Sequence, residues 1–500
     1  MSINIEDFLN NKKPSSSSTT EVVEEEKKYG KIYLVKVATG LGKTKEIEAA
    51  DVPLIACPTN DLKRELYDRR VASGKEVVMT PDSVKFSDER LDEKVQILYI
   101  LDDYKAVRHI IQSISKYGAY EHYRVTTDDR ESCILYLDQN KQIKENKDKT
   151  IITTHKRVMN GSFGHRVVIF DEDPTPTLID ESSFFLQDLE KLEGTLFEEY
   201  GKSLKKHLQS KRMSVINKDN LDTRIHIHRL GNKFKDISDD LKNHLIEKSE
   251  ISLLKFLLKG QDFYTSKDFN NKTNVKFVID DFSDINLERT VIVLSATVNK
   301  HLYRKVHGED KVISEDITRI HLTGKIIQDT RRSYSKNTMK HHLRKGDVVL
   351  DKLLREISKS GNPIISHKLF VKNFLMDYNF DSENTKVYFG NCSGYDEYTN
   401  RDLTVLGTPH KPPKIFEKFI MSKDRIIDIK ISDRVVEWRE FRFRFMAYED
   451  VDLYNLQMDA IESDLIQAVG RARALRNDVT VKVYSNFPLY IATDFITPKK

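Results

Sequence analysis

The chain has 500 residues, with 82 Lys and Arg against 78 Asp and Glu, so its formal net charge is only +4. This near-neutral balance excludes a uniformly basic, histone-like nucleic-acid binder, although not a local basic groove. The three cysteines, Cys57, Cys133 and Cys392, are too few for a disulfide framework or a four-thiolate metal site. They fit a reducing compartment, so we expect a cytoplasmic protein. No apolar run approaches the roughly 18 residues that predict a membrane-spanning helix.

The length predicts about two to four domains, and two similar patterns follow one another along the chain. Residues 1–28 include a Ser/Thr-rich and then charged stretch, typical of a disordered tail. Short β-branched runs then alternate with amphipathic patterns, which predicts α/β domains with parallel sheets. The first set of expected strands is 31–37, 53–57, 149–153, 166–170 and 290–294, and the second is 363–365, 386–389, 403–406 and 479–484. We therefore expect a first domain over 29–180, completed with a linker by 289–325, and a second domain over 326–500.

Between the two sets of strands, leucines recur at mostly three- or four-residue spacing, at positions 186, 189, 192, 196, 204 and 208. Such spacing predicts amphipathic helices with one buried face. We interpret 181–288 as a mainly helical insertion in the first domain.

The most informative stretch, KIYLVKVATGLGKTKEIEAA, runs from an apolar strand through a glycine-containing loop into a helical pattern. This is the context of a phosphate-binding loop, here formed by Thr39, Gly40 and Gly42. The two glycines let the backbone turn tightly and point its N–H groups at an anion. Lys43 would reach the β- and γ-phosphates of a nucleotide, and Thr44 would ligate Mg²⁺.

A second chemical signal is VVIFDEDP, an apolar strand followed by three acidic residues. The carboxyl end of a buried parallel strand is where such a sheet presents its ligands. Asp171 would hold Mg²⁺ through water, and Glu172 would orient and deprotonate an attacking water. A solvated acidic turn is the alternative for this stretch alone, but its pairing with a phosphate loop favours a nucleotide site.

With these motifs in this order, the chain resembles a superfamily 2 helicase. The stretches that carry the resemblance are ACPTN at 56–60, TTHK at 153–156, LSATV at 294–298, SGYD at 393–396 and QAVGRAR at 467–473. The resemblance covers about 30–300 and 325–490 of the sequence. It implies an α/β fold with two RecA-like P-loop NTPase domains that bind ATP and Mg²⁺ between them.

The resemblance also implies two further groups of site residues. Six residues of the first domain would contact nucleic acid or relay its movement: Pro58, Thr59, Thr154, His155, Ser295 and Thr297. Six residues of the second domain would bind the nucleotide or close over its γ-phosphate: Gly394, Asp396, Gln467, Gly470, Arg471 and Arg473. The catalytic set would be Lys43, Glu172, Gln467, Arg471 and Arg473.

The sequence departs from the family pattern at several points. Val37 replaces the first glycine of the phosphate-loop motif, and the acidic motif reads Asp-Glu-Asp-Pro. The long insertion and the S-G-x-D stretch are similar to the layout of XPD/DinG-type enzymes. Those enzymes usually carry four cysteines for an iron–sulfur cluster, which the three scattered cysteines of this chain cannot supply.

We therefore expect an ATP-dependent helicase that couples MgATP hydrolysis to translocation on nucleic acid and to its unwinding, with DNA favoured over RNA. Such an enzyme would act in the replication or repair of a phage, plasmid or similar element. Other replication or repair proteins would be its partners. The alternatives are an ATP-driven translocase or remodeller, and a nucleic-acid-sensing defence switch that separates no strands. The insertion at 181–288 would either grip nucleic acid or brace the fold.

The stretch WREFRFRF at 438–445 alternates aromatic and basic residues, which predicts a strand with one apolar and one basic face. Its apolar face would lie in the core and its arginines in solvent. A basic hairpin that stacks nucleic-acid bases is the alternative.

Overall fold

The structure is a computed structural model that describes residues 30–37, 43–100, 103–160, 163, 167–194, 198–209, 251–259, 263–267, 272–317, 322–392, 397–410 and 430–497. The tail expected at 1–28 lies outside the described residues. No helix in the described ranges is long and apolar enough to span a membrane. The chain forms two parallel α/β sheets, of seven and five strands, as expected for tandem RecA-like domains.

The seven-stranded sheet of the first domain has the order β10-β1-β9-β5-β2-β4-β3, and all its pairs are parallel. Its strands are β1 (Ile32–Val37), β2 (Leu54–Cys57), β3 (Val77–Met79), β4 (Thr150–Thr154), β5 (Val167–Asp171), β9 (Thr290–Ser295) and β10 (Val312–Ile317). Every residue of β1 is buried, because alternate side chains enter two different cores. Ile32 and Leu34 join one core, whereas Tyr33, Val35 and Val37 join the core on the other face. Such two-sided burial explains the continuous apolar strands of a parallel sheet.

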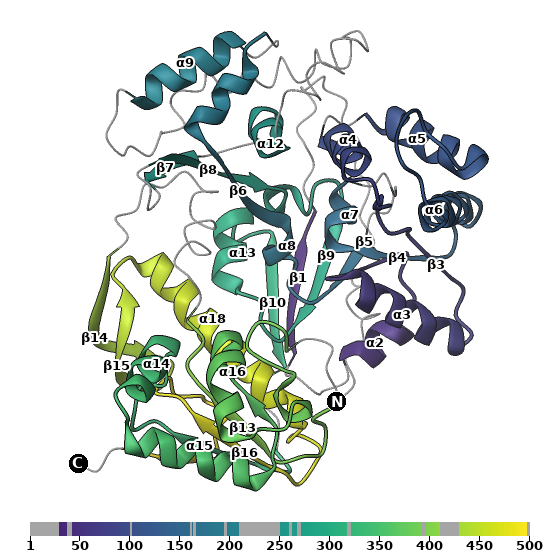
Figure 1. Ribbon diagram of the computed structural model, residues 1–500. Helices are drawn as coiled ribbons and strands as arrows, with labels where there is room; N and C mark the ends of the chain where they lie inside the picture. Colours follow the sequence, from purple (N-terminus) through teal and green to yellow (C-terminus); the bar gives the residue numbers. More distant parts are fainter. Residues whose placement is uncertain are drawn as a thin grey trace.

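Short helices connect and cover these strands (Figure 1). They are α2 (Lys43–Ala49), α3 (Asn60–Ala72), α7 (His155–Asn160), α8 (Thr175–Leu178) and α13 (Lys300–His307). Thr59 caps α3 by accepting a hydrogen bond from the Leu62 N–H at 3.3 Å. The cap fixes where the strand β2 turns into the helix, because it satisfies one of the free N–H groups of the first turn.

A helical lobe lies between β3 and β4, and the sequence patterns did not separate it from the first domain. It consists of α4 (Glu89–Ile100), α5 (Tyr104–Tyr117) and α6 (Thr127–Glu145), which share a core of their own. Thr126 and Asp129 form a reciprocal capping box at the start of α6. Cys133 is buried in this core, so it acts as a small apolar residue.

The insertion after α8 contains more strand than the sequence predicted. Its described part holds an antiparallel sheet of the order β6-β8-β7, formed by β6 (Ile179–Phe185), β7 (Phe263–Lys267) and β8 (Thr273–Asp280). Around it lie the 3₁₀ turns η1 (Leu186–Leu192) and η3 (Phe282–Asp284) and the helices α9 (Glu198–Gln209) and α12 (Ile251–Lys259). The leucine spacing located η1 and α9 but could not reveal the sheet that packs against them.

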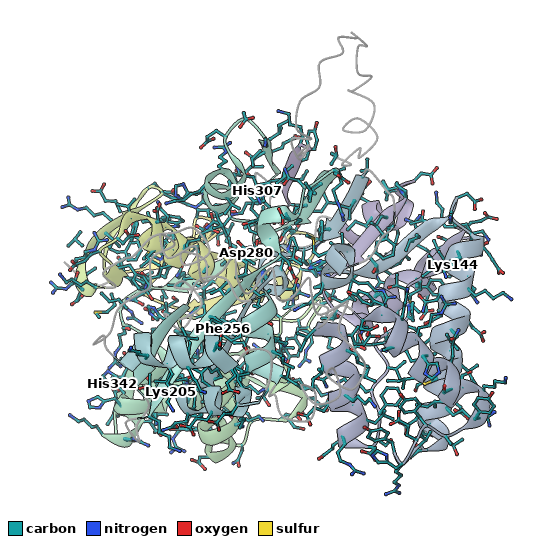
Figure 2. The ribbon with its side chains drawn as sticks, turned by 90° about the horizontal axis from the view of Figure 1, so that it is seen from above. Lys144, Lys205, Phe256, Asp280, His307 and His342 are labelled. Carbon is teal, nitrogen blue, oxygen red and sulfur yellow. The ribbon has the colours of Figure 1, made fainter. Side chains whose placement is uncertain are left out.

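The insertion and the helical lobe share the helix α4. Phe256 and Phe277 lie in the insertion core with their ring centroids 5.3 Å apart, and Figure 2 shows Phe256 within this region. Ile97 and Ile100 of α4 enter the same core, while Leu91 and Leu98 of α4 face the core of the lobe. The two additions therefore pack as neighbours rather than as independent attachments.

The five-stranded sheet of the second domain has the order β12-β13-β16-β11-β17, again all parallel. Its strands are β11 (Lys325–Asp329), β12 (Ile364–Ile365), β13 (Leu403–Leu406), β16 (Thr480–Tyr484) and β17 (Asp494–Ile496). The domain also contains the helices α14 (Lys336–Arg344), α15 (Val348–Ser360), α16 (Lys368–Phe374) and α18 (Val451–Val469), and the short 3₁₀ turns η4 (Leu375–Tyr378), η5 (Glu383–Thr385) and η6 (Gly470–Ala472).

The strand expected at 386–389 does not form. Tyr388 makes only an isolated bridge with Ser366. The Tyr388 N–H is taken by the side chain of Asn391 at 2.7 Å, and Gly390 then turns the backbone with a φ of +93°. A local side-chain hydrogen bond thus replaces the ladder that a strand would need.

The alternating stretch at 438–445 lies in a hairpin of β14 (Ile431–Trp438) and β15 (Phe441–Tyr448). Phe445 is buried in the second-domain core, whereas Arg442 and Arg444 are exposed. Arg444 pairs with Asp433 across the hairpin at 2.9 Å. The structure therefore shows the expected core face and solvated basic face.

The helix α18 joins the two domains (Figure 1). Met458, Ile461 and Leu465 lie in the core of the second domain. On the opposite side of the helix, Leu453 and Leu456 enter the core of the first domain. A helix with two apolar faces must be covered on both, so α18 docks one domain against the other.

Ion pairs flank this docking contact. Asp452, near the start of α18, pairs with Lys305 and lies 3.1 Å from His301 Nε2, both on α13. Two turns further on, Asp459 lies 3.6 Å from Lys36 Nζ on β1. Burial raises the pKa of Asp459 to about 6, despite the opposing charge of Lys36 and with smaller contributions from the Glu462 and Asp173 carboxylates.

We predict that docking of the domains strengthens as the pH falls from about 6 toward 4. The pKa of Asp459 is raised in the docked state to about 6, so below this pH the docked state binds more protons than the undocked state. Protonation of Asp459 therefore favours docking, and docking weakens as the pH rises through about 6. Asp459→Asn should remove this part of the pH dependence, measured by inter-domain fluorescence transfer. The exposed Asp478→Asn is the control, and an Asp459→Asn profile identical to wild type would contradict the prediction.

Candidate active site

The carboxyl ends of the first-domain strands gather the residues that the sequence singled out. Lys36 of β1 is in register with Ser295 of β9, and Asp171 of β5 is in register with Leu294 of β9. Because all the strands are parallel, the segments that follow them meet at one edge of the sheet. Lys43, the first residue of α2, lies at this same edge, in contact with Asp171.

Lys43 bridges the two acidic residues at the end of β5. Its Nζ lies 2.9 Å from Asp171 Oδ1 and donates a hydrogen bond to Glu172 Oε1. Burial disfavours the ammonium charge, but the two carboxylates outweigh burial and raise the pKa of Lys43 to about 12. The lysine is thus held as a cation that faces the ligand side of the sheet.

Asp171 has an oxygen suited to a metal or to its hydration shell. Its Oδ1 is buried and lies 2.9 Å from Lys43 Nζ, so the ammonium holds it in this structure. Burial raises the pKa of this carboxyl against the opposing charge of Lys43, and the nearby Glu172 charge adds to the rise. A carboxylate at this edge of the sheet would suit Mg²⁺, which usually binds one or two carboxylates together with substrate phosphates.

Other residues expected to bind a nucleotide belong to the phosphate loop. Thr39, Gly40 and Gly42 of the phosphate loop lie outside the described residues, as does the side chain of Thr44. Within the described ranges, no group of three or more His, Cys, Asp or Glu is arranged to hold a metal by itself.

Hydrogen bonds hold both the backbone and the carboxylate of Glu172. Its backbone has a φ of +75°, which is strained for a residue with a side chain, and its N–H donates to the Leu294 carbonyl at 3.0 Å. Ser295 Oγ donates to Glu172 Oε2 at 3.0 Å. Burial favours the neutral form, but Lys43, these hydrogen bonds and the charge of Arg471 hold the pKa of Glu172 below its ordinary value. The carboxylate is therefore ionised and oriented, as a general base requires.

His155 requires a correction. The sequence placed it as a nucleic-acid contact, but its side chain is fully buried against Phe170, with ring centroids 5.3 Å apart. Its Nε2 donates to the carbonyl of Asp171 at 3.0 Å, and burial lowers its pKa to about 4. A buried neutral imidazole cannot contact a nucleic-acid strand. His155 instead supports the backbone that carries the acidic pair.

The remaining first-domain candidates lie at the carboxyl ends of β2, β4 and β9. Thr59 is exposed, and Pro58 and Thr154 are half-buried. Ser295 is buried and hydrogen-bonded to Glu172, so it cannot contact a nucleic-acid strand directly either. Thr297, half-buried, donates its N–H to Ser295 Oγ at 3.1 Å and thus links the acidic pair to the following segment.

The second domain brings Arg471 to the acidic pair. Arg471 is buried at the end of α18, where its Nε donates to the Gln467 carbonyl at 3.4 Å, and its charge lowers the pKa of Glu172 across the domain boundary. Gln467, Gly470 and Arg473 are half-buried around the same turn, and Arg473 has a φ of +57°. Gly394 and Asp396 lie outside the described residues. Arg471 is thus an arginine of the second domain whose charge acts on Glu172.

Two features of the site were missed by sequence reasoning. Asp173 Oδ1 accepts hydrogen bonds from Thr175 Oγ1 at 2.6 Å and Tyr303 OH at 2.9 Å, so the third acidic residue anchors the segment after β5. Lys36 and Asp459 form the ion pair between the domains described above. Asp173 stood in the acidic motif itself, but neither Tyr303 nor Asp459 belongs to a recognisable pattern.

No protein-family model matches this chain, and no curated protein matches it. Among solved structures, a truncated XPD is similar with 13% identity and a TM-score of 0.29, over 58% of this chain and 95% of that chain. An S. cerevisiae Dbp5 variant bound to Nup159, a Gle1 variant, IP6 and ADP is similar with 8% identity and a TM-score of 0.28, over 91% of this chain and 80% of that chain. Both likenesses are distant, with TM-scores below 0.5.

We predict that Lys43→Ala lowers the free energy of unfolding at pH 8 by about 1.5–3 kcal/mol, the usual worth of a hydrogen bond to a charged group. The loss should shrink as the pH falls toward 5. Without the ammonium, the folded-state pKa values of the two neighbouring carboxyls rise, and stability is lost as pH rises through them. Denaturant unfolding of Lys43→Ala and Lys43→Arg at both pH values tests this, and equal stability of Lys43→Ala and wild type at pH 8 would contradict it.

Proposed function

We propose that the chain is a helicase-like ATPase that binds MgATP between its two parallel sheets and uses hydrolysis to move along nucleic acid. The observation that carries the proposal is the contact of Lys43 with both Asp171 and Glu172, approached from the second domain by Arg471. A partly buried lysine at a helix start, paired with carboxylates at the end of a strand in the same sheet, is what phosphate transfer to water requires.

Each residue has a distinct part in this proposal. Lys43 exchanges its carboxylate partners for the β- and γ-phosphate oxygens when the nucleotide binds. Asp171 would hold Mg²⁺ through water, and the ion would neutralise charge on the phosphates. Glu172, ionised and held by Ser295, accepts a proton from the attacking water. Arg471 stabilises the charge that develops on the transferred group.

The same geometry supports coupling between hydrolysis and movement. Ser295 touches Glu172 on one side and Thr297 on the other, at the exit from β9. Lys36, one strand away in register, contacts Asp459 of the second domain. A change in the acidic pair can therefore reach the segment after β9 and the domain contact through adjoining residues.

A helicase and a translocase would share this site, and strand separation distinguishes them. A forked duplex labelled on one strand shows release of that strand only if the chain unwinds it. The ATPase rate with single-stranded DNA, duplex DNA and RNA, compared side by side, identifies the polymer that stimulates hydrolysis. Stimulation without strand release would favour the translocase or the defence switch.

Glu172→Gln should bind MgATP with nearly wild-type affinity and hydrolyse it at least about 10²-fold more slowly, because it keeps the shape and removes the base. Phosphate release and fluorescent-nucleotide binding are measured on the same preparation. Glu93→Gln, an exposed position on α4, is the matched control. A wild-type rate in Glu172→Gln would remove the general base from the proposal, and no hydrolysis by the wild-type chain with any polymer would overturn the function.

Arg471→Ala should slow turnover by about 10²-fold or more, whereas Arg473→Ala should have a smaller effect. The reason is that the charge of Arg471 acts on Glu172 in the docked domains. Steady-state kinetics should show the loss mainly in kcat, because the arginine stabilises the transition state more than the bound nucleotide. A larger loss in Arg473→Ala would reverse the assignment of the two arginines.

A further inference from the structure

The helix α14 carries an unusually basic segment of the second domain. Residues 331–345 read RRSYSKNTMKHHLRK and contain no Asp or Glu. Met339 is buried and Leu343 packs against the same core, which fixes one face of α14 inward. The outward face is therefore composed largely of cationic side chains.

These cations follow the period of the helix. Lys336, Lys340 and Arg344 are spaced four residues apart and are all exposed, so they form one stripe along α14. We call these three residues the α14 stripe. At about 1.5 Å of rise per residue, successive charges of the stripe are roughly 6 Å apart along the helix axis.

The α14 stripe is not compensated by acidic neighbours. None of its three residues forms an ion pair within the part of the chain that the structure describes. On the neighbouring helix α15, by contrast, Lys352 lies 3.9 Å from Glu356, and Arg355 lies 2.9 Å from Asp351. Uncompensated charge on one helix, beside paired charge on the next, indicates a surface that attracts an anionic partner.

Three other basic residues near α14 are already paired. Arg331 binds Asp329, and Arg332 and His342 both contact Asp347, at 2.6 Å in each case. Figure 2 shows His342 at the outer edge of the molecule. Among the described residues of this segment, the lysine and arginine charge without an ion pair thus lies on the stripe and on the exposed Lys345 that follows it.

The stripe starts at the ligand side of the second sheet. α14 follows β11, and Ser335, the residue that caps α14, makes a bridge with Thr408 just after β13. The Thr408 N–H donates to the Tyr334 carbonyl at 3.1 Å, which fixes this junction. The carboxyl ends of parallel strands are where such sheets meet their ligands.

We propose that the α14 stripe binds the phosphate backbone of a nucleic-acid strand and extends its path over the second domain. This inference rests on the proposed function and adds to it the surface that holds the polymer. Three regularly spaced cations suit a linear polyanion, and the stripe contains no aromatic residue for base stacking. Binding by the stripe is therefore independent of sequence and depends strongly on salt.

The test is a variant of the full chain, Lys336→Gln/Lys340→Gln/Arg344→Gln, compared with wild type. Fluorescence anisotropy gives the Kd for labelled oligo-dT and oligo-rU at several KCl concentrations. The variant should bind at least about tenfold more weakly at low salt, and its slope of log K against log[KCl] should be smaller by about 2, from three contacts at about 0.7 each. Basal ATPase and the thermal midpoint should stay as in wild type, because the stripe lies outside the nucleotide site.

The matched control removes three positive charges from α15 instead, as Lys352→Gln/Arg355→Gln/Lys359→Gln, and should leave the salt slope unchanged. Wild-type affinity and slope in the α14 variant would overturn the inference while leaving the proposed function intact. A wild-type chain that hydrolyses ATP but binds neither oligonucleotide would overturn it too, and a chain without ATPase activity would overturn the proposed function itself. Loss of binding to an acidic peptide, with oligonucleotide binding unchanged, would assign the stripe to a protein partner and contradict the proposal.

Discussion

The contact of one lysine with two carboxylates is the constraint on which the rest of the site depends. Lys43 begins the helix α2, and Asp171 and Glu172 lie at the end of a strand, so their contact fixes α2 against the acidic edge of the sheet. The neighbouring groups serve this contact. The His155 ring donates a hydrogen bond to the Asp171 carbonyl, and Ser295 of the neighbouring strand β9 donates one to the Glu172 carboxylate. Without phosphate, the lysine is neutralised by the carboxylates that would otherwise repel one another.

The second constraint is the helix α18, which belongs to two cores at once. Its apolar faces oblige the domains to dock, and its end delivers Arg471 to Glu172. The ion pair of Asp459 with Lys36 lies in the middle of this helix, one strand from Ser295. Docking and the contacts of the acidic pair are therefore parts of one arrangement.

The parts that sequence could predict are those whose signal is local. An apolar strand followed by a glycine loop or by acidic residues predicts that Lys43 and Glu172 lie at one edge of the sheet, because parallel strands bring their ends together, and the two side chains are in contact there. The fate of His155 was not readable, since TTHK does not reveal that its imidazole is covered by Phe170. The antiparallel sheet of the insertion, the lobe of α4 to α6 and the Asp459 contact depend on tertiary packing between distant segments. The strand expected at 386–389 failed for a local reason, the Asn391 side chain that binds its backbone.

The most direct test of the account is equilibrium binding of ATP to the purified chain, with and without Mg²⁺, for wild type and Lys43→Met. The account predicts one ATP bound per wild-type chain, weakening on removal of Mg²⁺, and at least about tenfold weaker binding in the variant because the phosphate-facing cation is gone. Equal ATP affinity in the two proteins, or a wild-type chain that binds no nucleotide, would contradict the claim that Lys43 and the acidic pair form a nucleotide site.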